Sequence, residues 1–237
     1  VIPLPTRHPL LWYIYFEILL PIYVKRYKID LFLSPDGYIP TWGKTKTLPV
    51  IHDINYEHDP SFMGRKSYLR YYKHFFPIFA KKATRVATVS EFSRRDIASV
   101  YQIAESKIDV VYSAAKEEYK PCSKEEIVAT KTRYTDSKDY FYFVGSLHKR
   151  KNLANLFRAF DLFKTETQSD VKLVIVGSKM WWKGEVAEAF EAMKYKDEVI
   201  FTSRLSTEEV NRIASASIAC MFVSLFEGFG VPPLEAF

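Results

Sequence analysis

The chain has 237 residues, of which 48% are hydrophobic, 26% charged and 16% aromatic. This length fits one large domain or two small ones, and the hydrophobic content excludes a globally disordered chain. The formal net charge of +6 favours acidic partners such as nucleotides, lipid phosphates or nucleic acid, without choosing among them. Cys122 and Cys220 form neither a CxxC pair nor a Cys/His cluster, which argues against a disulfide framework or a zinc site and fits a reducing compartment.

The most hydrophobic segment, LLWYIYFEILLPIYV, runs from Leu10 to Val24. It is shorter than the roughly 20 apolar residues of a membrane-spanning helix, and it contains Glu17 and Pro21. We therefore expect a buried helix here. A helix that lies at a membrane interface is the alternative.

Short β-like runs then alternate with helical stretches up to Ser113. Strands are expected at 29–35, 48–53, 85–90 and 107–113. A long helix is expected at 66–82. Ser90 can cap a second helix, which has an apolar stripe of Ile97, Val100 and Tyr101.

From Ala114 to Asp139 the composition becomes charged and polar, without a strong apolar period. We interpret 114–139 as a linker, with a helix at 125–134 as an option inside it. The linker separates a partial N-terminal domain, residues 1–113, from a partial C-terminal domain, residues 140–237.

The second half has a clearer rhythm of strands and helices. Continuous apolar runs at 140–147, 171–178, 198–203 and 218–224 are typical of strands buried on both faces. The helices between them are expected after residue 152, at 185–194 and after Ser206, which forms a capping-box pattern with Glu209. This alternation predicts an α/β fold with a parallel sheet and right-handed crossovers.

The stretch VGSLHKRKN, Val144 to Asn152, follows a predicted strand and precedes a predicted helix. Ligands of open α/β sheets bind at the carboxyl ends of strands, and a helix N-terminus there suits phosphate. Lys149, Arg150 and Lys151 add positive charge at this point. A phosphate-binding loop and an ordinary solvated basic loop both remain open from these residues alone.

The stretch SLFEGFGVPPLEAF follows the last predicted strand and carries two carboxylates, Glu227 and Glu235. Gly228 and Gly230 allow positive φ and a close backbone approach to a ligand. The pair suits a glycosidase acid and nucleophile. In the simpler interpretation, Glu235 only complements a helix dipole and Glu227 is an exposed loop residue.

Together these stretches resemble the retaining, nucleotide-sugar-dependent glycosyltransferases of the GT-B fold, in the large group 1 (family 4) of mainly bacterial enzymes. The pattern EGFGxPxLEA matches Glu227 to Ala236 without a mismatch, and Gly-Ser-Leu-x-x-Arg-Lys-Asn matches Gly145 to Asn152. Weaker similarities lie in VATVSEFSRRDI (86–97), VIHDINY (50–56) and VIVGSKMWW (174–182). In contrast, Gly145-Ser146 stands where many relatives have Gly-Arg.

The resemblance implies two Rossmann-like parallel-sheet domains that face a cleft, both incomplete in this chain. It implies that Glu235 binds the donor ribose, that Glu227 contacts the transferred sugar, and that His52 lies near the acceptor, although a structural contact at a strand end suits His52 as well. The residues implied to bind the donor are Ser146, Arg150, Lys151, Gly228, Phe229, Gly230, Val231 and Glu235.

The implied activity is hexose transfer from a nucleoside diphosphate sugar, such as a GDP- or UDP-sugar, to a glycan or lipid-linked acceptor in cell-surface polysaccharide synthesis. No metal or other cofactor is implied, because cationic side chains take the place of a divalent ion. We expect a cytoplasmic, mannosyltransferase-like protein; peripheral contact with the inner membrane face is compatible with the sequence. The resemblance implies a protein of roughly 350 or more residues in two Rossmann-like domains, so we expect an incomplete copy with little or no transfer activity of its own.

Three other functions compete with glycosyl transfer. A non-catalytic nucleotide-sugar or polysaccharide-binding fragment is the main alternative. A nucleic-acid-binding protein is disfavoured, because the basic residues are distributed and no nucleic-acid module is recognisable. A glycosidase is disfavoured by the basic pair Arg150 and Lys151 beside the carboxylates.

Overall fold

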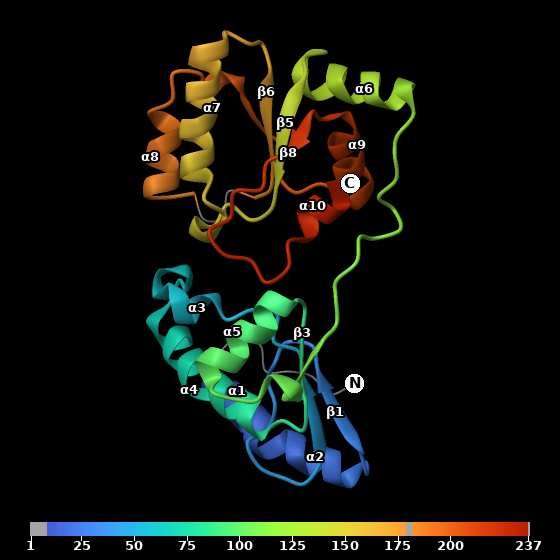
Figure 1. Ribbon diagram of the computed structural model, residues 1–237, viewed down its shortest axis with the longest axis vertical. Coiled ribbons are helices and arrows are strands. Elements are labelled where there is room, and N and C mark those ends of the chain that lie inside the picture. The colour runs from blue at the N-terminus through green and yellow to red at the C-terminus, as the bar shows by residue number, and fades with distance from the viewer. Residues whose placement is uncertain (1–8, 179–181, 237) are drawn as a thin grey trace. The chain divides into compact units, whose positions relative to one another are not determined.

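The computed structural model describes residues 9–178 and 182–236 of the chain. Contacts divide the chain into two compact units. The first contains the residues up to Ser113 together with the short segment Glu227–Phe229, and the second contains Ala114–Phe226 and the residues from Gly230 onward. Both units combine helices with parallel strands (Figure 1).

The first unit begins with a helical run in three parts: α1 (Pro9–Ile14), a π-helical turn η1 (Tyr15–Leu19) and α2 (Leu20–Arg26). Pro21 has no N–H, so the carbonyl of Glu17, four residues earlier, lacks its usual helical partner. The indole Nε1 of Trp42 donates to that carbonyl instead. The carboxylate of Glu17 is buried and accepts from the backbone N–H of Thr41 at 3.1 Å.

The expectation of a buried helix at residues 10–24 is correct for one face only. Phe16 and Leu20 are buried in the core of the first unit, whereas Leu11, Ile18 and Ile22 are exposed. Within the described residues, no helix is both long and apolar enough to cross a membrane.

The described strands of the first unit form two two-stranded sheets: β1 (Leu31–Ser34) with β2 (Lys46–Pro49), and β3 (Val86–Thr88) with β4 (Ile108–Val110). β1 pairs in parallel with β2, and β3 pairs in parallel with β4. A bridge between Val50 and Ala87 links the two pairs, and the N–H of Ile51 donates to the carbonyl of Ala87 at 2.8 Å.

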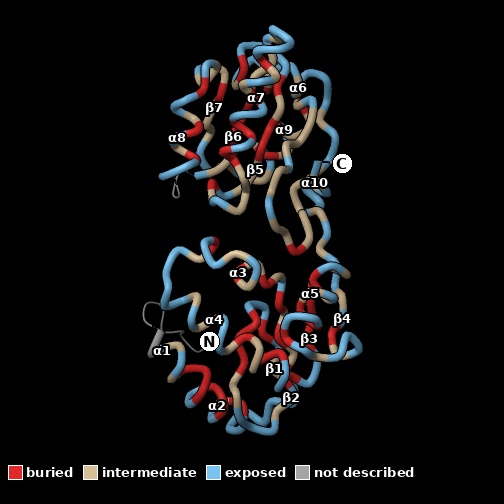
Figure 2. Tube along the Cα trace, turned by 60° about the vertical axis from the view of Figure 1, so that its left-hand side comes forward, coloured by how far each residue is buried: buried red, intermediate tan, exposed pale blue. Residues whose placement is uncertain are grey.

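The remaining helices of the first unit are α3 (Asn55–His58), η2 (Pro60–Phe62), α4 (Lys66–Lys82), α5 (Glu91–Tyr101) and η3 (Glu105–Lys107). The predicted helix at 66–82 is confirmed with the same bounds. Ser90 caps α5 as predicted, since its hydroxyl accepts from the N–H of Ser93 at 3.0 Å. The core of this unit is rich in aromatic rings, among them Phe76 and Phe79. The buried stretches of the chain, red in Figure 2, include part of α2.

The second unit has a four-stranded parallel sheet in the order β7-β6-β5-β8. Its strands are β5 (Tyr140–Val144), β6 (Lys172–Val176), β7 (Val199–Phe201) and β8 (Ala219–Cys220). The chain moves from β5 through β6 to β7 on one side and returns to place β8 on the other. The strand order therefore reverses between β5 and β8, which is where open α/β sheets bind ligands.

Helices cover both faces of this sheet, α7 and α8 on one face and α6 and α9 on the other (Figure 1). Residues of β5 alternate accordingly: Phe143 belongs to the cluster with α7, and Tyr140 and Tyr142 belong to the cluster with α9. The helices are α6 (Lys124–Thr135), η4 (Lys149–Lys151), α7 (Leu153–Thr167), α8 (Glu185–Glu191), η6 (Lys196–Glu198), α9 (Thr207–Ala216) and α10 (Val231–Ala236).

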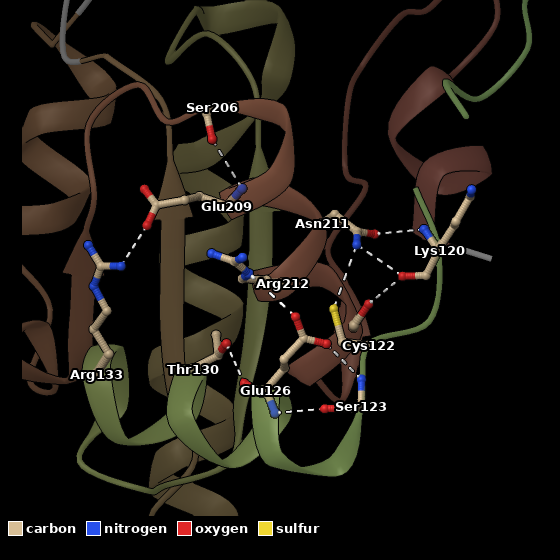
Figure 3. Close-up of polar contacts among 11 residues, drawn as sticks. Lys120, Cys122, Ser123, Glu126, Thr130, Arg133, Ser206, Glu209, Asn211 and Arg212 are labelled. Carbon is tan, nitrogen blue, oxygen red and sulfur yellow. Dashed lines mark hydrogen bonds and ion pairs between the residues drawn. The ribbon is translucent and has the colours of Figure 1, made fainter. Parts of the chain in front are cut away.

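Residues 114–139, which we expected to form a linker, group with the second unit and contain α6. Asn211 of α9 holds the extended part of this segment, since its side chain bonds the N–H of Lys120 at 3.1 Å and its carbonyl at 2.9 Å (Figure 3). α6 packs against α9. Composition alone suggested a linker because the exposed face of α6 is polar.

The capping box expected at Ser206 forms only in part. The hydroxyl of Ser206 accepts from the N–H of Glu209 at 3.3 Å, but the Glu209 carboxylate binds Arg133 of α6 at 2.6 Å (Figure 3). A complete capping box lies instead at Ser123 and Glu126, at the start of α6. The carboxylate that would complete the capping box at Ser206 thus binds Arg133 of α6 instead.

Candidate functional site

The loop that follows β5 leaves the sheet through a tight backbone arrangement. Gly145 has φ +151° and its N–H donates to the carbonyl of Val176 at 3.0 Å. A Cβ on Gly177 would lie 2.0 Å from the carbonyl oxygen of Gly145. The ends of β5 and β6 can approach this closely only because residue 177 has no side chain.

The basic residues of this loop form a short helical turn, η4, before α7. The imidazole Nδ1 of His148 accepts from the N–H of Arg150 at 3.2 Å and so begins the turn. Asn152 has φ +60° and precedes α7, whose first N–H groups are at this edge of the sheet. Ser146 is exposed, and Lys151 is half-buried. Cationic side chains and a helix N-terminus are thus gathered at the carboxyl end of β5.

The loop after β8 is held by this basic loop through three hydrogen bonds. The N–H of Leu225 donates to the carbonyl of Arg150 at 2.9 Å, and Nη1 of Arg150 donates to the carbonyl of Phe226 at 2.6 Å. Nδ2 of Asn152 donates to the carbonyl of Val223 at 3.0 Å. The basic loop and the residues just before the acidic motif therefore lie side by side at the point where the strand order reverses. Sequence reasoning did not foresee that Arg150 and Asn152 hold the acidic motif's loop.

The second carboxylate of the motif, Glu235, is half-buried on α10. Its neighbours include Tyr119, from the extended segment before α6, and Cys220 of β8. Burial, reinforced by the charge of Glu235, raises the pKa of Tyr119 to about 12, so this hydroxyl is a hydrogen-bond donor near neutral pH. Burial raises the pKa of the Cys220 thiol, and Glu235 adds to the effect. No sequence motif pointed to Tyr119.

The glycine turn of the motif has contacts within the first unit. The carbonyl of Gly228 accepts from Oγ of Ser90 at 2.5 Å and from Oγ of Ser93 at 3.2 Å. A Cβ on Gly228 would lie 2.5 Å from the carbonyl oxygen of His52, so only a glycine lets the two backbone segments approach this closely. Gly230 instead has a positive φ of +97°. Ser90 and Ser93 were missed as site residues, although VSEFSRRDI contained the signal.

Glu227 and Phe229 flank Gly228, and both are half-buried. The ring of Phe229 lies 6.2 Å from that of Tyr112, centroid to centroid. Among the predicted site residues, His52, Glu227, Gly228 and Phe229 belong to the first unit, and Ser146, Arg150, Lys151, Gly230, Val231 and Glu235 belong to the second.

His52 lines a cavity of about 320 Å³ within the first unit. Its Nε2 lies 3.1 Å from the carbonyl oxygen of Pro35. The cavity is also lined by Trp12, Asp36 and Asp53. Across the described residues, the structure contains no cluster of three or more His, Cys, Asp or Glu side chains that could hold a metal ion. The similarity of VIVGSKMWW to the family rests partly on residues 179–181, which lie outside the described residues.

Two family models match the chain, and between them they leave few residues uncovered. The model for glycosyl transferases group 1 matches residues 124–237, and the model for Glycosyltransferase Family 4 matches residues 1–118. The EGFGVPPLEA and Gly145–Asn152 motifs both lie in the first of these matches.

Curated relatives include the O-antigen chain mannosyltransferase B of Escherichia coli, 24% identical over 90% of this chain and 56% of the relative. The O-antigen chain mannosyltransferase RfbU of Salmonella typhimurium is 26% identical over 96% of this chain and 59% of the relative. The chain thus spans less than two thirds of the length of these relatives.

Solved structures share the fold at low identity. WaaG, a glycosyltransferase involved in lipopolysaccharide biosynthesis, aligns with a TM-score of 0.73 and 14% identity over 99% of this chain and 65% of that chain. Anabaena Alr3699/HepE in complex with UDP-glucose aligns with a TM-score of 0.66 and 16% identity over 81% of this chain and 50% of that chain. With its motifs, its parallel α/β units and these matches, the chain has the GT-B fold, and its residues 124–237 belong to the glycosyl transferases group 1 family.

Proposed function

We propose that the protein represented by this chain is a retaining, metal-independent glycosyltransferase. It transfers a hexose from a nucleoside diphosphate sugar to a glycan or lipid-linked acceptor during cell-surface polysaccharide synthesis. The relatives named as O-antigen mannosyltransferases support a mannose donor, and the UDP-glucose complex of HepE supports a nucleoside diphosphate sugar as the donor class. Because the chain spans only part of its relatives, the activity is assigned to the whole protein.

The observation that carries the proposal is the set of hydrogen bonds between the basic loop and the acidic motif's loop. Nη1 of Arg150 binds the carbonyl of Phe226 at 2.6 Å, immediately before Glu227. The basic loop is thereby joined to the residues just before Glu227 at the reversal point between β5 and β8, which supports a donor site there. A solvated basic loop or a helix-capping carboxylate does not require this connection.

The donor binds in this proposal with its diphosphate at the basic loop. Lys151, Arg150 and the N-terminus of α7 stabilise the negative charge that develops on the departing nucleoside diphosphate, and Ser146 lies beside them. Glu235 accepts hydrogen bonds from the ribose hydroxyls. Since the cationic loop supplies the charge stabilisation, no metal ion is required for the leaving group.

The remaining motif residues contact the transferred sugar in this proposal. Glu227 bonds the sugar hydroxyls, and the backbone from Gly228 to Val231 approaches the sugar and the phosphates. The acceptor oxygen forms a bond to the anomeric carbon, whose bond to the phosphate oxygen breaks with its electron pair on the diphosphate. The acceptor proton is released to solution. His52 lies beside the acceptor.

Calorimetric titration of GDP, UDP and their sugars tests the donor site. We expect saturable binding that weakens about tenfold in Lys151→Ala, since one charged hydrogen bond to phosphate is lost. The matched control is Arg158→Ala, because Arg158 is an exposed cation of α7 that binds Glu185 on α8. Equal loss in both variants, or no binding of any nucleoside diphosphate, contradicts the proposal.

A turnover measurement distinguishes an enzyme from a non-catalytic binding protein. The protein that extends this chain to the length of its relatives should transfer or hydrolyse the donor that binds, and Glu227→Ala should reduce that rate while donor affinity changes less. Tight donor binding with no turnover under any acceptor supports the non-catalytic alternative instead.

A further inference from the structure

The open cavity beside His52 has a lining whose chemistry differs from that of the donor loop. Its volume, about 320 Å³, lies at the small end of the range for ligand pockets, so it suits one small ring rather than an extended ligand. The side chains that decide its chemistry are Trp12, Asp36, Tyr38, His52, Asp53 and Tyr72.

Aromatic rings form the apolar walls of this cavity. Trp12 packs edge-on against Tyr38 with 5.0 Å between ring centroids, and Tyr72 stacks on Phe76 at 4.5 Å. Such rings offer flat apolar faces, which complement the C–H faces of a pyranose. Burial raises the pKa of Tyr38, so its hydroxyl stays neutral and adds no charge to the walls.

Hydrogen-bonding groups point to a ligand that carries hydroxyls. Tyr38 donates its hydroxyl proton to Tyr72 at 2.6 Å, so the proton of Tyr72 remains for another acceptor. Nε2 of His52 faces the carbonyl of Pro35 and must donate to it, which leaves Nδ1 as an acceptor whenever the ring is neutral. One donor and one acceptor thus line the same small space.

Two carboxylates complete the lining. Oδ1 of Asp53 accepts from the N–H of Asn55 at 3.0 Å, and no bond to Oδ2 is found among the described residues. In that same part of the chain, Asp36 has neither a hydrogen bond nor an ion pair, although its charge raises the pKa of Tyr38. Carboxylates accept hydrogen bonds from sugar hydroxyls and repel phosphate.

None of the lining residues identified in the described structure is a lysine or an arginine. We propose that this cavity binds the acceptor as an uncharged sugar ring, and that it excludes a ring that carries phosphate. This inference rests on the proposed function. It assigns the enzyme to chain elongation: an earlier glycosyl transfer must supply the neutral sugar to which this enzyme adds.

The test compares matched pairs of ligands on the wild-type chain. Ligand-observed NMR titrations would use methyl α-mannoside, methyl α-glucoside and the 6-phosphates of the same glycosides. We expect saturable binding of at least one neutral glycoside and roughly tenfold weaker binding of its phosphate, since two carboxylates oppose the added charge. Equal or tighter binding of the phosphate, or no saturable binding of any neutral glycoside, overturns the proposal.

Two substitutions, one in the cavity and one outside it, test whether the cavity sets the preference for a neutral glycoside over its phosphate. Asp36→Asn should narrow the difference between glycoside and phosphate about threefold, because half of the opposing charge is removed. Asp30→Asn removes the same charge from an exposed position that does not line the cavity, and it should leave the difference unchanged. Thermal melts confirm that both variants fold. An identical response from the two variants contradicts the placement of the sugar in this cavity.

Donor titration on the same sample separates this inference from the proposed function. If nucleoside diphosphates bind but phosphorylated glycosides bind as well as neutral ones, only the acceptor inference fails. If no nucleoside diphosphate binds, the proposed function itself fails.

Discussion

The basic loop after β5 and the cavity beside His52 are opposite in charge although both are small polar sites. The loop carries three consecutive cations, Lys149 to Lys151, at a helix N-terminus. The cavity has two carboxylates, Asp36 and Asp53, and its described lining has no lysine or arginine. Each region attracts the group that the other repels.

This difference explains how one chain could sort two substrates that both contain sugars. A sugar with a diphosphate is favoured at the loop and disfavoured at the cavity, and an uncharged sugar has the reverse preference. Repulsion contributes to specificity as much as attraction does, because it lowers the affinity of the wrong ligand. Shape alone distinguishes two hexoses poorly, since a small apolar difference changes binding by only about 1–3 kcal/mol.

The largest expected effect comes from disrupting the base of the loop. In Gly177→Ala the new Cβ would meet the carbonyl oxygen of Gly145 at 2.0 Å, and backbone atoms must shift. We expect destabilisation by about 3 kcal/mol and loss of nucleoside diphosphate binding, while the cavity in the first unit keeps its glycoside affinity.

Chemical denaturation and the two titrations would measure these effects. Ser178→Ala, at the exposed next residue, is the control and should resemble the wild type. Normal stability of Gly177→Ala would show that the close approach of β5 and β6 is not required.

A charge swap at the cavity would remove the contrast between the regions. Asp36→Lys introduces a cation where the cavity has a carboxylate, so a glycoside 6-phosphate should bind roughly tenfold more tightly than in the wild type. Nucleoside diphosphate affinity at the loop should stay the same. NMR titration of both ligands measures the swap, and unchanged phosphate affinity would show that charge does not set the preference.

The smallest expected effect concerns two exposed ion pairs, one in each unit, and the stability that each contributes as the pH falls. Arg85 binds both carboxylate oxygens of Asp109, which lowers the pKa of Asp109, and Lys138 likewise lowers the pKa of Asp170. A depressed folded-state pKa contributes stability above the unfolded value of about 3.9, and that contribution is lost as the pH falls through the folded value.

Asp109→Asn should therefore lower Tm near pH 7 by roughly 1 °C and Asp170→Asn by less, because the arginine binds in bidentate fashion. Both differences should shrink as the pH falls below the unfolded value of about 3.9 and through each lowered folded-state pKa. Melting curves across this range measure them, and a difference that grows in acid would contradict the sign.

The pattern of the sequence was sufficient to predict where most helices and strands lie. Apolar spacing predicted the helix at 66–82 with its observed bounds, because seventeen residues of consistent period leave little ambiguity. The strand expected at 218–224 is only Ala219–Cys220, since the residues beyond it leave the sheet to form the motif's loop. The π-helical turn at Tyr15–Leu19 was not predicted, and no local pattern connects it to Trp42, whose indole donates to the carbonyl of Glu17 within that turn.

The site was predictable only where residues carry a family motif. The spacing of Glu227 and Glu235 and the run around Arg150 were enough to single them out, but the bond from Arg150 to Phe226 was not. The cavity was invisible in the sequence because Trp12, Asp36, His52 and Tyr72 are far apart along the chain and meet only through folding. Contacts between residues that are distant in the sequence therefore form the parts of the site that no motif predicts.

Asn152 illustrates how narrow the choice of residue can be at one position. It must adopt φ +60° to turn the chain into α7, and its amide must donate to the carbonyl of Val223. Glycine satisfies the first demand and lacks the amide, whereas glutamine has an amide but tolerates this backbone conformation poorly. Replacement of Asn152 by either residue therefore loses the turn or the bond. The orientation of the N-terminus of α7 and the position of the loop after β8 both depend on this one residue.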